Sequence, residues 1–82
     1  MVKCFVYGLR SVTDRTRFYT GVTSDVSARI ESHNAGRCDH TAKFRPWELV
    51  VALEFGSEER ALAFERYLKS GSGRAFAKRH FG

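Results

Sequence analysis

The chain begins with the stretch VKCFVYGLRSVTDRTRFYTGV (residues 2–22), in which two β-forming segments flank a polar loop. Residues 2–7 and 17–22 are rich in aromatic and β-branched side chains, which is typical of strands. The loop of residues 11–16 between them is short, so we expect the two strands to pair as a hairpin. This hairpin is the unit to which the later elements add.

Capping residues and apolar patterning predict those later elements. In chain order they are a helix over residues 24–35, a polar connection over 37–47, a strand over 48–55, a helix from 57 to about 69 and a short helix over 74–80. Ser24 and Ser57 are placed to cap the two longer helices, and Gly36 is placed to end the first. Residues 48–55 are the most apolar segment, so we expect them at the centre of the sheet. The glycines within residues 71–73 predict a hinge.

The order β-β-α-β-α-α predicts a small α/β (α+β) sandwich: a three-stranded, mainly antiparallel sheet flanked by helices. The 82 residues suffice for one compact domain, and we treat 1–82 as that domain. No stretch approaches the roughly 18 continuous apolar residues of a membrane-spanning helix. The two cysteines are too few for a disulfide scaffold. We therefore expect a soluble, cytoplasmic protein without a membrane partner.

The charges of the chain are unevenly distributed. Lys and Arg outnumber Asp and Glu by 14 to 9, and all nine acids lie between Asp14 and Glu65. The last 17 residues contain no acid and five cations, which are Arg66, Lys69, Arg74, Lys78 and Arg79. A segment of one sign attracts a polyanion such as nucleic acid through salt-sensitive phosphate contacts. A generic solvated basic helix is the alternative.

Two of the predicted helices place ionisable side chains on the face that should turn inward. Arg29 and His33 share the side of Val26 in the first helix, and Glu65 follows Ala61 by one turn inside the apolar stripe of the second. A carboxylate at a core-facing position is costly unless it is paired or bound to a metal. Two interpretations follow: a structural Arg29–Glu65 ion pair, or a charged cleft with an acid for a metal and a base for phosphate.

Two further patterns are open to a structural and a chemical interpretation. Tyr7 and Tyr19 lie on the two strands of the hairpin, where paired tyrosines more often serve packing than chemistry. His33, Cys38 and His40 are ligand types suited to Zn²⁺. Their spacing matches no compact zinc finger, however, and a fourth ligand is missing.

Taken in chain order, these positions resemble the signature of the GIY-YIG nuclease superfamily. The first motif is present as FVY at residues 5–7 and the second as YTG at 19–21. Arg29 lies in a segment similar to the arginine-bearing helix of the family, and Glu65 lies in a Glu-x-x-Leu-Lys setting. Similarity to small single-domain members extends to HNAG at 33–36, RPWELV at 45–50 and LKSGSGR at 68–74. The resemblance thus covers nearly the whole chain.

The resemblance implies a metal-dependent endonuclease that hydrolyses phosphodiester bonds of nucleic acid, DNA rather than RNA, in repair or recombination. It implies that Glu65 binds one divalent cation, Mg²⁺ with Mn²⁺ as a substitute. Arg29 would contact the phosphate oxygens, and Tyr7 or Tyr19 would position the attacking water. His33, one turn after Arg29, would be a general base. A phosphate contact or a buried structural histidine are the alternatives for His33.

Six basic residues are expected to bind the nucleic acid: Lys43, Arg45, Lys69, Arg74, Lys78 and Arg79. Specificity in this family usually comes from appended domains, so we expect a partner protein to supply it here. The alternative function is a nucleic-acid-binding module with the same fold and weak or no catalysis. Val22 and Ala77 stand where some members of the family carry a lysine and an asparagine.

Overall fold

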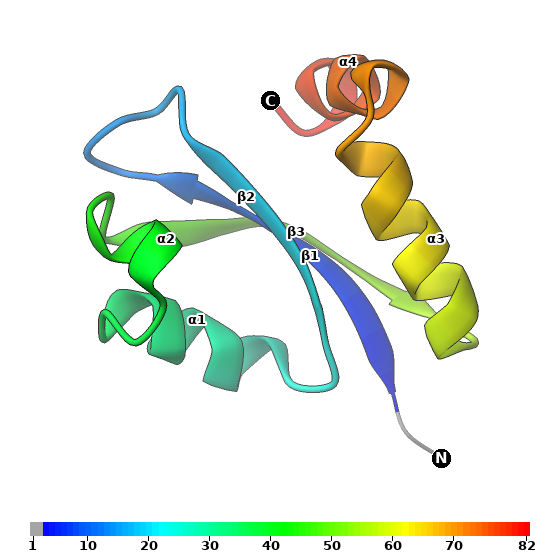
Figure 1. Cartoon of the computed structure of the whole chain (residues 1–82), viewed down its shortest axis with the longest axis horizontal. Helices are drawn as coiled ribbons and strands as arrows, with labels where there is room; N and C mark the ends of the chain where they lie inside the picture. The colour runs from blue at the N-terminus through cyan, green and yellow to red at the C-terminus, as the bar shows by residue number, and fades with distance from the viewer. Residues whose placement is uncertain (1–2) are drawn as a thin grey trace.

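The protein folds as a three-stranded antiparallel sheet with helices on both faces (Figure 1). The computed structural model describes residues 3–82. In chain order the elements are β1 (Cys4–Ser11), β2 (Phe18–Thr23), α1 (Val26–Asn34), α2 (Asp39–Ala42), β3 (Trp47–Phe55), α3 (Glu58–Leu68) and α4 (Gly71–His80). This confirms the predicted α+β sandwich with the order β-β-α-β-α-α. The short helix α2 lies within the predicted connection.

The predicted hairpin of β1 and β2 is present with shifted boundaries. β1 continues to Ser11 because the polar groups of that residue find partners: its N–H donates to the Arg17 carbonyl over 3.1 Å, and its hydroxyl donates to the Phe44 carbonyl over 2.6 Å. The antiparallel register pairs Tyr7 with Gly21. Residue 2, at which the strand was predicted to begin, lies outside the described residues.

The central strand of the sheet is β1, so the prediction that the segment forming β3 is central was wrong. β3 pairs with β1 alone, and its Leu49 and Leu53 side chains remain 45% and 36% exposed. Apolar content was misleading because β1 contains Gly8. The space above this glycine is filled by the Phe18 ring and the Val51 side chain from the two neighbouring strands. A central strand can therefore contain a glycine when side chains of the neighbouring strands cover it.

Helix α1 begins one residue later than the predicted cap implied. Asp25 rather than Ser24 is the N-cap, and its carboxylate accepts a hydrogen bond from the Ala28 N–H over 3.0 Å. Gly36 follows the helix with φ +78°, the left-handed conformation that favours glycine. Ser57 caps α3 as predicted, by accepting from the backbone N–H three residues further on.

The predicted hinge at residues 71–73 is instead the first turn of α4. Ser70 caps this helix, and its hydroxyl accepts from the Gly73 N–H over 3.2 Å. A Cβ at Gly73 would collide with the Tyr67 carbonyl group. The glycine therefore allows α4 to pack against the end of α3 and does not provide flexibility. Within residues 3–82, none of the helices is long and apolar enough to cross a membrane.

Two apolar clusters lie on opposite faces of the sheet, because successive side chains of a strand point to opposite sides. The cluster on the side of α3 and α4 contains Cys4, Val6, Ala61 and Leu68. The cluster on the side of α1 contains Tyr7, Leu9 and Trp47. Tyr7 therefore shares a face with the helix that carries Arg29 and His33. Glu65 comes from the helix on the opposite face.

Candidate active site

A buried hydrogen-bonded chain links the central strand to α1 and α2. Tyr7 and His33 are only 0% and 1% exposed. The Tyr7 hydroxyl lies 3.0 Å from His33 Nε2, and His33 Nδ1 lies 2.8 Å from the Thr41 hydroxyl. The Thr41 hydroxyl in turn donates to the Cys38 carbonyl over 3.3 Å. Three side chains are thus joined in one line below the surface.

The donor and acceptor roles in this series of hydrogen bonds follow from its last side chain, Thr41. The Thr41 hydroxyl has one hydrogen, which it donates to the Cys38 carbonyl, so its oxygen accepts from His33 Nδ1. His33 Nε2 then lacks a hydrogen and accepts from the Tyr7 hydroxyl; the network assigns this tautomer. Burial lowers the pKa of His33, and the positive charge of Arg29 acts in the same direction. His33 is therefore neutral at pH 7 and is able to take up a proton at Nε2.

Tyr19 covers this pair from the edge strand β2. Its ring centroid lies 4.8 Å from that of His33 and 6.2 Å from that of Tyr7. Burial raises the pKa of both phenols above the ordinary value of 10.0, and the Arg29 guanidinium opposes the increase at each. Both phenols are protonated at neutral pH, so neither is a base unless another group accepts its proton.

Gly21 makes room for the Tyr7 side chain on the neighbouring strand. A Cβ at this position would lie 2.5 Å from the Tyr7 hydroxyl oxygen and 2.7 Å from the adjoining ring carbon. The phenol therefore lies directly over the glycine. The YTG and FVY motifs meet at this contact.

Arg29 is the exposed charge of this group. Its guanidinium lies beside the Tyr7 hydroxyl, which raises the pKa of Arg29. The same charge acts on the pKa values of Tyr19 and His33, so all three buried or half-buried rings lie within its field. A guanidinium placed in this way can bind an anion that approaches from solvent.

Glu65 approaches from α3 and is largely buried, with a side chain that is 17% exposed. Its Oε2 lies 2.7 Å from Lys69 Nζ, one helical turn away. The Arg29–Glu65 ion pair considered from the sequence is therefore not formed. The carboxylate charge raises the pKa of Tyr19. Tyr19 is thus close both to His33 on the α1 side of the sheet and to Glu65 on the α3 side.

The structure also tests the zinc site considered from the sequence. Among residues 3–82, no three His, Cys, Asp or Glu side chains gather as a metal site. His33, Cys38 and His40 therefore do not form one. Both nitrogens of His33 are already occupied by Tyr7 and Thr41.

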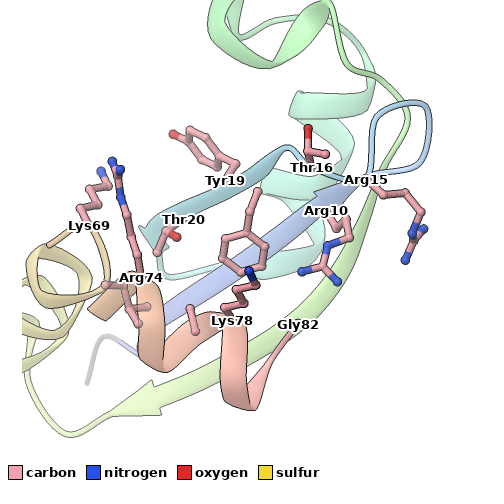
Figure 2. Close-up of a pocket in the computed structure, with 12 residues that line it drawn as sticks. Arg10, Arg15, Thr16, Tyr19, Thr20, Lys69, Arg74, Lys78 and Gly82 are labelled. Atoms are coloured by element: carbon pink, nitrogen blue, oxygen red, sulfur yellow. The ribbon is translucent and has the colours of Figure 1, made fainter. Parts of the chain in front are cut away.

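Beside Tyr19 a groove of about 950 Å³ runs between the β1–β2 hairpin and α4 (Figure 2). We call it the basic groove, after the five cations that line it together with Tyr19: Arg10, Arg15, Lys69, Arg74 and Lys78. Three of the six predicted nucleic-acid-binding residues are among them. The other three, Lys43, Arg45 and Arg79, do not line this groove. The Arg45 guanidinium instead donates to the Ala42 carbonyl over 3.0 Å.

Comparison with known proteins decides the family of the chain. The family model of the GIY-YIG catalytic domain matches residues 3–79. The chain belongs to this family. The resemblance seen in the sequence is thereby confirmed, and the two motifs that meet at Tyr7 and Gly21 are those from which the GIY-YIG family takes its name.

Relatives of this GIY-YIG chain are of two lengths. The structure-specific endonuclease subunit SLX1 of Debaryomyces hansenii is 39% identical over an alignment of 71 residues, and the match covers 78% of this chain and 20% of SLX1. The UPF0213 protein SH2523 of Staphylococcus haemolyticus is 37% identical over an alignment of 73 residues, and the match covers 88% of this chain and 87% of that protein. The chain therefore spans about a fifth of the SLX1 relative and most of the UPF0213 protein.

A solved structure supports the same fold. The solution NMR structure of the UPF0213 protein BH0048 from Bacillus halodurans is 31% identical to this GIY-YIG chain, with a TM-score of 0.58. The match covers 98% of this chain and 87% of that protein.

Sequence reasoning missed three side chains of this GIY-YIG domain, one in the buried hydrogen-bonded chain and two in the basic groove. Thr41 lies in a segment predicted to be a plain connection, and its contact with His33 depends on the turn of α2. Arg10 lies beyond the predicted end of the first strand, and Arg15 lies in the loop that follows. The length of the hairpin was the one signal that could have found the two arginines, because a longer hairpin brings them toward the basic C-terminal helix.

Proposed function

We propose that this GIY-YIG domain is an endonuclease that hydrolyses phosphodiester bonds of DNA with the help of one divalent cation. The observation that carries the proposal is the Tyr7–His33 hydrogen bond beside the exposed Arg29 guanidinium. A phenol that donates to a neutral, buried imidazole is a proton path with an acceptor at its end. A packing role alone requires neither the unprotonated nitrogen nor the adjacent fixed cation.

The exposure of the side chains suggests which of them meets the substrate. Tyr7 and His33 have almost no exposed surface, whereas Tyr19 is half-buried and lines the basic groove. We assign Tyr19 and Arg29 to the substrate side: Tyr19 holds the attacking water, and Arg29 binds the non-bridging phosphate oxygens. The proton released by the water passes along the phenols to His33 Nε2. General-base catalysis of this kind typically contributes about 10²–10⁴-fold to a rate.

Glu65 is the residue that would hold the metal. A single carboxylate suits Mg²⁺, which keeps several waters and takes further oxygen ligands from a substrate phosphate. Mn²⁺ takes the same oxygen ligands. The bound ion would stabilise negative charge on the phosphate and on the leaving oxygen. Lys69, which pairs with Glu65 in the structure, would then be free to contact a neighbouring phosphate.

The biological setting is proposed from the relatives. SLX1 of Debaryomyces hansenii is a structure-specific endonuclease subunit, and its match to this chain covers a fifth of its length. We therefore propose branched DNA as the substrate, a role in repair or recombination, and a partner protein that supplies specificity. A nucleic-acid-binding module remains the second candidate, because the Glu65–Lys69 ion pair occupies the carboxylate that catalysis requires.

The test is a nicking assay on supercoiled plasmid with Mg²⁺, with Mn²⁺ and with a chelator. We expect metal-dependent nicking by the unchanged protein and its loss in Glu65→Gln. Glu59→Gln is the matched control, because it removes an exposed carboxylate from the same helix. DNA binding with no metal-dependent nicking by the unchanged protein would favour the binding module. Equal nicking by the unchanged protein and Glu65→Gln would remove Glu65 from the reaction.

A further inference from the structure

The basic groove extends well beyond the residues that would contact the cleaved phosphate. Lys69 and Arg74 lie at one end beside Tyr19, while Arg10 and Arg15 lie at the other (Figure 2). No acidic side chain lines it. The cations come from β1, the hairpin loop and the C-terminal helical region, which are far apart in the sequence. The fold thus assembles a row of cations that begins at the candidate active site, of which Lys69 and Arg15 are paired with carboxylates outside the groove lining.

Arg10 is a groove cation whose charge has no carboxylate partner among the described residues. It lies opposite Glu48 in the β1–β3 pairing, but the Glu48 carboxylate pairs with Arg15 over 3.0 Å. Within residues 3–82, no carboxylate lies at ion-pair distance from Arg10, and its buried Nε has no hydrogen-bond partner. Nε itself is covered, so a phosphate oxygen would be bound by the terminal nitrogens of this half-buried guanidinium, whose charge has no carboxylate partner.

The floor of the basic groove is apolar rather than charged. Phe18, Leu68 and Ala77 contribute to it, and the Arg10 guanidinium lies 5.6 Å from the centroid of the Phe18 ring. A duplex presents its phosphates to a protein surface and keeps its bases stacked inside. An unpaired strand, in contrast, places bases on apolar and aromatic side chains while cations follow its backbone. The apolar floor and the cations along the groove therefore favour binding of an unpaired strand over binding of a duplex.

We propose that the basic groove binds an unpaired nucleic-acid strand that continues from the cleaved phosphate, with Arg10 as its far phosphate contact and Phe18 under its bases. This inference rests on the proposed function only in placing the cleaved phosphate at Tyr19. It names the substrate class of the same site: DNA with a single-stranded branch next to a duplex. It also gives Arg10 and Arg15, which the charge pattern of the C-terminal segment did not indicate, a role in binding.

Binding is measured by fluorescence anisotropy of a labelled single-stranded oligonucleotide and of a blunt hairpin duplex, in a chelator and across a salt series. Arg10→Met with Lys78→Gln removes two groove charges. Arg37→Gln with Arg60→Gln is the matched control, since both side chains are exposed and neither lines the groove. For the groove variant the slope of log K against log salt should fall by about 1.4 on the single strand, at about 0.7 per phosphate contact. The control should change it little.

Phe18→Leu separates stacking from charge. It should weaken binding of the single strand and leave binding of inorganic polyphosphate unchanged. Circular dichroism establishes that each variant is folded, and the exposed Lys78→Gln alone serves if the Arg10 variant unfolds. The proposal is overturned if the groove variant and the control variant lose the same affinity for the single strand. It is also overturned if the groove variant loses as much affinity for the duplex as for the single strand, or if Phe18→Leu binds the single strand normally. Because no metal is present, these results stand apart from the nicking assay, in which the proposed function itself fails or succeeds.

Discussion

Replacing Thr41 by valine removes one hydroxyl from the buried chain while keeping the shape of the side chain. His33 Nδ1 then has no acceptor, and a buried unsatisfied donor costs about 1–3 kcal/mol of stability. The Cys38 carbonyl loses less, because it also accepts from the backbone N–H groups of Thr41 and Ala42. His33 escapes part of the cost by moving its proton to Nε2. That nitrogen would then donate to the Tyr7 hydroxyl and could no longer accept its proton.

We therefore expect Thr41→Val to slow single-turnover nicking by about 10²-fold or more, the scale of a lost general base. DNA affinity should stay unchanged, because Thr41 is buried and does not line the basic groove. Thr41→Ser restores the hydroxyl and should restore the rate. The ¹⁵N chemical shifts of the His33 ring report the tautomer directly, even if nicking proves too slow to measure. A normal rate, or a proton still on Nδ1 in the valine variant, would refute the assigned donor and acceptor roles of His33.

Three further outcomes are expected. Arg29→Lys keeps the charge but loses the planar donor pair, so nicking should fall about 10²–10³-fold with little change in affinity; an unchanged rate would exclude a phosphate role. The lowered pKa of His33 means that the unfolded state binds more protons below about pH 6.5, so the free energy of unfolding should decline there by up to about 1.4 kcal/mol per pH unit. Urea titrations should show this slope in the unchanged protein and a weaker one in His33→Gln. Gly73→Ala should destabilise by about 1–3 kcal/mol because its Cβ meets the Tyr67 carbonyl, whereas Gly71→Ala, with open space around it, should cost nothing. Equal thermal stability of the two glycine variants would contradict the account of the α3–α4 junction.

The parts of the fold that follow from local chemistry were predictable from the sequence. Ser57 caps α3 because its hydroxyl satisfies a free N–H of the first turn, and that requirement is visible in the sequence alone. Gly36 follows the end of α1 with a positive φ, a conformation that glycine favours and that is therefore also a local preference. The start of α3 and the end of α1, which depend on these local preferences, were predicted correctly, whereas the cap of α1 was placed one residue early, at Ser24 instead of Asp25.

The parts that depend on distant contacts were not predictable in the same way. Gly73 was interpreted as flexible because its close approach to Tyr67 cannot be seen in the sequence. The central position of β1 depends on its pairing with both β2 and β3, and the pairing with the distant β3 cannot be read from the sequence. Thr41 joins the candidate site only through the turn of α2, so no spacing rule links it to His33. The signature residues themselves were found because a resemblance to known proteins carries three-dimensional information that periodicity lacks.

The contact between Tyr7 and Gly21 makes the two signature tripeptides a single steric unit. Any side chain at position 21 must push the phenol aside, since even one added carbon atom would overlap the hydroxyl. The displaced ring would leave His33 Nε2 without its donor. A protein altered at this glycine would therefore keep the exposed Arg29 guanidinium and lose the proposed proton path from Tyr7 to His33.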